Sequence, residues 1–98
     1  MTRSRSQKAQ LTTLLNISPE LARKLKRVGV FSKKDFLASD PYSVFHLLRK
    51  KVTSSLGREA LASIVGAASN VPWQDVTQEA AIEYERRYPL HKWRKDKL

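Results

Sequence analysis

The sequence predicts an all-α protein, folded as a single compact bundle of about five short helices. Three observations support this prediction. Apolar residues recur every three or four positions through most of the chain, as they do on the buried face of a helix. Ser, Thr or Asp precedes several of these segments as a potential cap, and Gly, Asn or Pro follows them. No segment shows the strict apolar–polar alternation that is typical of a half-exposed strand.

The best-marked helix is predicted between Ser18 and Gly29. Ser18 is a suitable N-cap because its hydroxyl can accept a hydrogen bond from an early backbone N–H. Pro19 suits the first helical position, where an N–H would have no partner. Gly29 fits the left-handed position that ends a helix, so we expect a positive φ there. The apolar face of this helix consists of Leu21, Ala22, Leu25 and Val28.

Two further capped segments follow in the first half of the chain. Ser32 and Asp35 have the spacing of a capping box, with Asp in place of the usual Glu or Gln, and predict a helical turn over residues 32–37. Asp40 and Pro41 repeat the cap-plus-proline pattern and open a helix over residues 41–51. Upstream of both, residues 11–15 are expected to form a short opening turn.

The second half of the chain is predicted to contain two more helices. The longer covers residues 56–69, with Thr53-Ser54-Ser55 offering caps. Gly66 costs this helix about 1 kcal/mol relative to Ala, so we expect it where a neighbouring helix packs closely. Thr77 is the expected cap of the last helix, over residues 78–88, which Pro89 ends.

The predicted core draws one or two large apolar residues from each helix. Trp73 follows a chain reversal, and we expect its ring to close one end of the core rather than to bind a ligand. The expected core residues are Leu21, Leu25, Val28, Phe36, Phe45, Leu48, Leu61, Ile64, Val65 and Trp73.

Length and composition indicate one small domain. Its 98 residues, 41% of them hydrophobic, suffice for a single core. We expect a flexible basic arm at residues 1–10, the domain at residues 11–89 and a basic tail at residues 90–98. No apolar run approaches the ~20 residues of a membrane span, and residues 1–6 lack the apolar segment of a secretory signal. We therefore expect a cytoplasmic protein with no membrane partner.

Positive charge is concentrated in the first half of the chain. The net charge is +10, from 19 Lys and Arg against 9 Asp and Glu. Residues 1–50 hold eleven basic and three acidic side chains, a balance of +8, whereas residues 51–98 hold eight and six, a balance of +2. Such a field favours a polyanion, either nucleic acid or an acidic protein.

The sequence offers no constellation for catalysis. His46 and His91 have no carboxylate at metal-ligand spacing, and the chain contains no cysteine. The glycine patterns of nucleotide-binding loops and of serine hydrolases are also missing. We therefore predict no enzyme, no cofactor, no metal site and no small-molecule substrate.

Two segments resemble a known family. Residues 14–37, with an apolar turn, a capped helix, a glycine stop and a second capped turn, are similar to a helix-hairpin-helix unit of a SAM-like bundle. Residues 61–76 resemble the helix-then-tryptophan block that ends the C-terminal domain of the TfoX/Sxy competence regulators. The resemblance covers about residues 11–88 and only the C-terminal half of those regulators. It implies a bacterial cytoplasmic protein of competence or transcriptional regulation, whose helical domain binds DNA or a protein.

The resemblance also implies where nucleic acid would bind. In helix-hairpin-helix domains a glycine-bearing turn lets backbone N–H groups approach a phosphate, with Lys or Arg beside it. Here the turn is residues 16–19, which lacks glycine and, at Pro19, one N–H donor. We therefore expect side chains to provide the contacts, assisted by Arg3, Arg5 and the tail. The expected binding residues are Ser18, Arg23, Lys24, Lys26, Arg27, Lys33 and Lys34.

Three classes of function are compatible with these patterns to different degrees. We favour a non-catalytic nucleic-acid-binding domain, with DNA ahead of RNA as the partner. We expect its sequence preference to be slight, because the basic helix carries no Asn or Gln to read adenine edges. The alternative is a protein–protein interaction module of a bacterial regulator, in which the charge serves solubility or meets an acidic partner. An enzyme ranks third.

Overall fold

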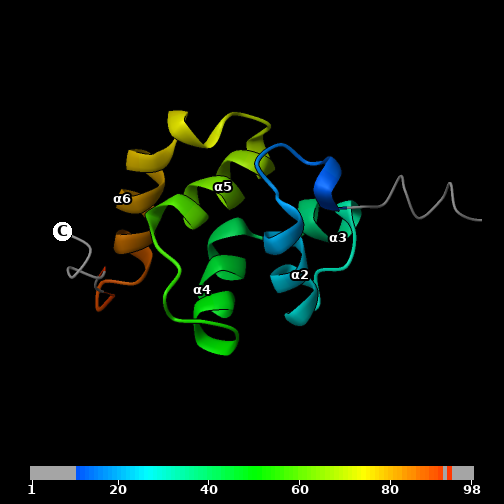
Figure 1. The fold of residues 1–98 in the computed structure, drawn as a ribbon. Helices are drawn as coiled ribbons and strands as arrows, with labels where there is room; N and C mark the ends of the chain where they lie inside the picture. Colours follow the sequence, from blue (N-terminus) through cyan, green and yellow to red (C-terminus); the bar gives the residue numbers. More distant parts are fainter. Residues whose placement is uncertain (1–10, 92, 94–98) are drawn as a thin grey trace, which may run out of the picture.

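The computed structural model describes residues 11–91 and 93, which form five α-helices, two short 3-10 helices and no strand (Figure 1). The all-α prediction is confirmed. The predicted arm at residues 1–10 lies outside the described residues, as do residues 92 and 94–98 of the predicted tail. The elements are η1 (Leu11–Thr13), α2 (Pro19–Arg27), α3 (Lys33–Leu37), α4 (Pro41–Lys51), α5 (Arg58–Ser69), η2 (Trp73–Asp75) and α6 (Thr77–Arg87).

Helix α5 lies at the centre of the bundle. It packs against α4, η2 and α6, whereas α2 packs against α4 and η1, and α3 packs against η1. Figure 1 accordingly shows α6 on one side of the molecule and α2 with α3 on the opposite side, separated by α4 and α5. The first half of the chain therefore supplies one side of the bundle and the C-terminal helix supplies the other.

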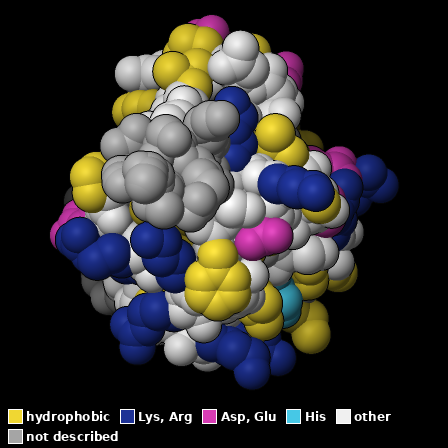
Figure 2. Space-filling model, turned by 90° about the vertical axis from the view of Figure 1, so that its right-hand side faces the viewer, with side chains coloured by type: hydrophobic (Ala, Val, Ile, Leu, Met, Phe, Trp, Pro, Cys, Tyr) yellow, Lys and Arg dark blue, Asp and Glu magenta, His cyan; other side chains and the backbone are white. Residues whose placement is uncertain are grey.

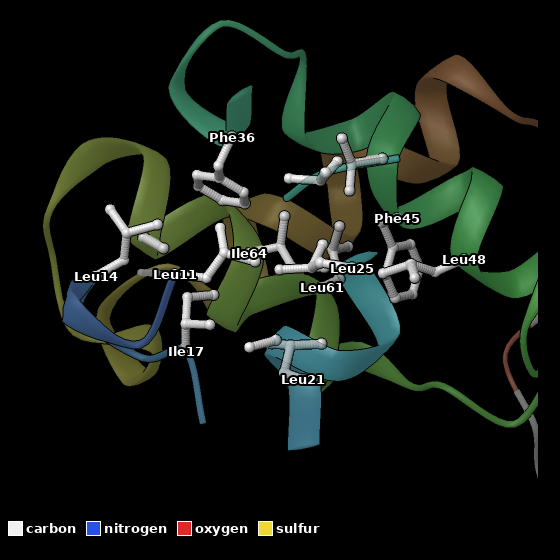
Figure 3. Close-up of a cluster of buried hydrophobic side chains, with 14 of the residues drawn as sticks. Leu11, Leu14, Ile17, Leu21, Leu25, Phe36, Phe45, Leu48, Leu61 and Ile64 are labelled. Atoms are coloured by element: carbon white, nitrogen blue, oxygen red, sulfur yellow. The ribbon is translucent and has the colours of Figure 1, made fainter. Parts of the chain in front are cut away.

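The core runs continuously between these two sides (Figure 3). Seven of the ten expected core residues are buried: Leu21, Leu25, Phe36, Phe45, Leu48, Leu61 and Ile64. Val28 and Val65 are partly buried and pack against this cluster. Leu11, Leu14 and Ile17, which precede α2, complete the cluster together with Tyr84 of α6.

The prediction that the Trp73 ring closes the core is wrong. Trp73 is partly exposed and lies outside the buried cluster. Its backbone N–H donates to the side chain of Asn16, so its main chain is fixed while its side chain remains at the surface. The large aromatic that fills the C-terminal end of the core is instead Tyr84, whose ring meets that of Phe45 edge-on at 5.1 Å.

The helix caps in the first half agree with the sequence. The Leu21 N–H donates to Ser18 Oγ (3.1 Å), and the Ser43 N–H donates to Asp40 Oδ2 (2.9 Å). The Asp35 N–H likewise donates to Ser32 Oγ (3.1 Å). The boundaries of α4 at residues 41 and 51 are those predicted.

The predicted starts of the last two long helices need correction. Helix α5 begins at Arg58 rather than at residue 56, and its N-cap is Gly57, with no side-chain cap bond. Helix α6 begins at Thr77 itself, and its N-cap is Val76. Thr77 is therefore inside the helix rather than at its cap position, and its hydroxyl donates back to the Trp73 carbonyl (2.9 Å).

Gly66 marks a close approach, as predicted, but its neighbours do not belong to a helix. A Cβ at this position would lie 2.6 Å from the carbonyl oxygen of Val71 and 2.7 Å from Nδ2 of Asn16. Both distances are below any real Cβ contact, so only glycine fits. Because Gly66 has no side chain, the segment before α2 and the loop after α5 can meet directly over α5.

Candidate nucleic-acid interface

The turn before α2 achieves its shape without glycine. Asn16 adopts a left-handed conformation, with φ of 73°, which Asn tolerates better than most residues. Its side-chain amide donates from Nδ2 to the Val71 carbonyl (2.8 Å) and accepts at Oδ1 from the Trp73 N–H (3.2 Å). Asn16 therefore replaces the expected glycine and also ties this turn to the loop after α5.

The N-terminus of α2 offers few backbone donors to an anion. Pro19 has no N–H, and the Leu21 N–H is already bonded to Ser18 Oγ. The Ala22 N–H bonds to the Ser18 carbonyl at 2.8 Å. Among the described residues this leaves Glu20, whose own carboxylate repels an anion, as the one early N–H of α2 without a partner. The backbone at the start of α2 therefore offers little to an anion, and side-chain contacts to phosphate stay a prediction.

Helix α2 directs its cations away from the core. Leu21, Ala22 and Leu25 are buried, so their face is fixed by packing. Because successive residues of a helix advance by about 100°, Arg23 and Arg27 lie on the opposite face, about 6 Å apart along the helix axis. Both are exposed. Lys24 and Lys26 flank them, with Lys24 partly buried and Lys26 exposed.

Helix α3 adds Lys33 and Lys34 at its first turn. Both side chains are exposed, as is Ser18 at the start of α2. Figure 2 looks at the side of the molecule that carries α2 and α3, and dark blue Lys and Arg side chains gather over the lower part of this face. The surface formed by α2, the following turn and α3 is called the α2–α3 surface below.

The cations of the α2–α3 surface lack carboxylate partners within the described part of the chain. Every ion pair among the described residues is made by Arg86 or Arg87, which lie on α6. The Asp35 carboxylate is engaged with backbone, since its Oδ2 accepts from the Phe31 N–H (3.1 Å). Arg23, Lys24, Lys26, Arg27, Lys33 and Lys34 therefore form no ion pair with a described carboxylate, although Glu20 and Asp35 place two negative charges on the same elements.

Two exposed features of the structure were missed from the sequence. The first is Phe31, in the turn between α2 and α3, which is 63% exposed although its neighbour Val30 is buried. Its place outside any helical period was the available signal. The last turn of α4 also carries three cations, of which Lys50 and Lys51 are exposed.

The described part of the C-terminal side of the molecule is rich in aromatic rings. His46 stacks on Tyr88, with ring centroids 4.1 Å apart, and its Nδ1 lies 3.0 Å from the Tyr84 hydroxyl. His91 meets the rings of Tyr84 and Trp93 edge-on, at 4.9 and 4.3 Å. Burial lowers the pKa of both histidines, and the charge of Arg49 acts in the same direction. These histidines are structural members of an aromatic cluster.

The described residues include no group of three or more His, Asp or Glu side chains that could hold a metal ion. Within the same residues, no helix has the length and apolar composition needed to cross a bilayer.

These features define a small all-α domain whose exposed cations on α2 and α3 have no ion-pair partner among the described residues. Residues 7–87 match the TfoX C-terminal domain, and the chain belongs to this family. The resemblance noted in the sequence is thereby confirmed. No curated protein and no solved structure matches the chain.

Proposed function

We propose that this domain is a non-catalytic nucleic-acid-binding module of a cytoplasmic bacterial regulator, which grips the phosphates of DNA with the α2–α3 surface. The observation that carries the proposal is the set of six cations on two adjacent helices without carboxylate partners among the described residues. Membership of the TfoX C-terminal domain family supports the regulatory setting.

Phosphate neutralisation would provide most of the affinity. Each Lys or Arg that contacts a phosphate of duplex DNA releases condensed counterions, so binding weakens as salt increases. Arg23 and Arg27, on the outer face of α2, are best placed to reach two phosphates. Sequence preference should be slight, because phosphate contacts carry no sequence information and no Asn or Gln lies on α2 to read a base edge.

The test is a titration of the full chain against duplex DNA, single-stranded DNA and RNA of equal length, at several salt concentrations. Each phosphate contact should add about −0.9 to the slope of log affinity against log salt on duplex DNA. Arg27→Gln should weaken binding to all sequences and flatten this slope by about one unit.

Arg86→Gln is the matched control for this test. It also removes one positive charge from the last turn of a helix, but that charge lies on α6 and is paired with Glu83. We expect it to leave the slope nearly unchanged. Binding that is undetectable at low salt, or equal slopes for the two variants, would contradict the proposal.

A second candidate, a protein-interaction module, is favoured by the exposure of Leu37. This side chain is 52% exposed on α3, the helix that also carries Lys33 and Lys34. An acidic protein could contact the leucine and the lysines together. In that case Leu37→Asp would abolish regulatory activity in cells, whereas Arg27→Gln would leave it largely intact. The nucleic-acid proposal expects the reverse order of effects.

A further inference from the structure

Phe31 is the exposed exception among the three phenylalanines of the chain. Phe36 and Phe45 are 1% and 0% exposed and belong to the core, whereas Phe31 is 63% exposed. A single exposed apolar side chain is common on protein surfaces. What distinguishes Phe31 is the combination of a fixed backbone and nearby cations in the chain that form no ion pair with a described carboxylate.

The backbone of Phe31 is held on both sides. Before it, Gly29 turns the chain with φ of 90°, and the Val30 N–H donates to the Leu25 carbonyl (3.0 Å). The Phe31 N–H itself donates to Asp35 Oδ2 (3.1 Å). The position of the ring's attachment is therefore set before any ligand binds, which reduces the entropy lost on binding.

Several cations lie near Phe31 in the chain, beside one negative charge, the Asp35 carboxylate that accepts from the Phe31 N–H. Lys33 lies two residues further along, so the two Cα atoms are at most about 7.6 Å apart, and Lys34 is next to it. Arg27 ends α2 four residues upstream. Figure 2 shows exposed apolar atoms among the dark blue side chains on this face. Proteins that bind single strands combine these two elements, cations along the backbone and an aromatic ring on which a base stacks.

We propose that Phe31 stacks on an unpaired base, and that the preferred ligand of the α2–α3 surface is therefore single-stranded DNA or an unpaired site in DNA. This inference rests on the proposed function and narrows its ligand. A side chain that stacks on a base must carry a flat aromatic ring. An apolar contact to an acidic protein, by contrast, could be made equally well by a leucine. Replacing Phe31 by leucine therefore distinguishes a nucleic-acid partner from a protein partner.

The experiment compares Phe31→Ala, Phe31→Leu and Phe31→Tyr in the full chain, using single-stranded and duplex DNA of equal length. A 2-aminopurine in the single strand reports stacking through its fluorescence. We expect Phe31→Ala and Phe31→Leu to weaken single-strand binding about 5- to 150-fold, with a change of about twofold or less on duplex DNA. Phe31→Tyr should behave as the wild type, in both affinity and fluorescence change.

Thermal unfolding of each variant is the control, and little change is expected because the side chain is exposed. If Phe31→Leu binds the single strand as the wild type does, the side chain acts as a general apolar contact and the inference is wrong. It is also wrong if Phe31→Ala has no effect while Arg27→Gln weakens binding, in which case the proposed function stands alone. Absence of binding by the wild type to every oligonucleotide would overturn both.

Discussion

The two sides of the bundle carry similar cations but surround them differently. On α6, Arg87 Nε lies 2.7 Å from Glu83 Oε2 and Arg87 Nη1 lies 3.0 Å from Asp40 Oδ2, while Arg86 Nη2 pairs with Glu83 Oε1 at 2.9 Å. Arg87 also lies over the ring of Tyr42, 4.4 Å from its centroid. The cations on α2 and α3 have no such neighbours among the described residues.

The pairing on α6 also changes the titration of its members. Hydrogen bonds from Arg87 and Arg86 lower the pKa of Glu83, and the bond to Glu83 raises the pKa of Arg87. Burial tends to raise the pKa of Asp40, but hydrogen bonds from Ser43 and the charge of Arg87 outweigh it and lower the pKa. Net charge alone does not locate a binding surface. The comparison teaches that, among the described residues, the cations of the α2–α3 surface are unpaired whereas Arg86 and Arg87 of α6 are paired.

The largest expected effect comes from the core that joins the two sides. Leu61, on α5, is fully buried, so Leu61→Ala should lower the free energy of unfolding by about 2–5 kcal/mol. Urea unfolding should remain one transition, because both sides share this core. Ile82→Ala, at a side chain of α6 that is 59% exposed, should change stability by about 0.5 kcal/mol or less. Two separate transitions would show that the two sides are independent units.

The next effect concerns Asn16, which links the two sides. Asn16→Ala removes the hydrogen bonds to Val71 and Trp73 and leaves a residue that tolerates the left-handed conformation less well than Asn, so we expect a loss of about 2–3 kcal/mol. Asn16→Gly removes the same hydrogen bonds without the steric cost, and should be more stable than Asn16→Ala by about 1 kcal/mol. Equal stability of the two variants by thermal unfolding would remove the conformational part of this account.

A smaller effect is expected at Gly29, on the α2–α3 side alone. Nothing lies within 4 Å of a Cβ built there, so the cost of Gly29→Ala comes from its φ of 90° and should be about 1 kcal/mol. Gly29→Asn should lose less, because Asn tolerates positive φ. Chemical denaturation of both variants measures the difference, and a Gly29→Ala variant as stable as the wild type would refute the assignment.

Local features of the fold were predictable from the sequence because their partners are near in the chain. The caps at Ser18, Ser32 and Asp40, and the turn at Gly29, depend on residues within about four positions. The predicted starts of α5 and α6 were wrong because the expected cap residues take other roles: Thr77 is the first residue of α6, and its hydroxyl donates to the Trp73 carbonyl. Thr53 Oγ1 bonds to Ser55 Oγ at 2.8 Å instead of capping a helix.

Features that depend on distant partners could not be predicted. Asn16 bonds to residues 55 and 57 positions away, and nothing in its own segment indicates them. Trp73, whose backbone N–H makes one of these bonds, is partly exposed, and Tyr84 fills the core instead. For the candidate site, the outward direction of the α2 cations followed from helical periodicity. Their lack of partners and the exposure of Phe31 are tertiary properties, and nucleic-acid binding by these residues stays a prediction.

The smallest predicted effect is a pH dependence confined to the C-terminal side. Burial lowers the pKa of His46, as do the charges of Lys50 and Arg49. Burial also lowers the pKa of His91, where Arg49, His46 and Arg58 act in the same direction and Glu85 opposes them. The folded protein therefore favours the neutral histidines. Below a pH of about 6.5 the unfolded chain takes up protons first, and stability should fall as the pH decreases from 7.5 to 5.5.

Urea unfolding at both pH values measures this dependence. The double variant His46→Gln, His91→Gln should show a flatter dependence, whatever its stability at pH 7.5. Carboxylates contribute little in this window, because the ordinary pKa values of Asp and Glu lie near 4 and those of Asp40 and Glu83 are lower still. Amide NMR shifts should move on α4 and α6 but not on α2 and α3, which contain no histidine. Stability that is constant or rises on acidification would show that the histidines are not held neutral by the aromatic cluster.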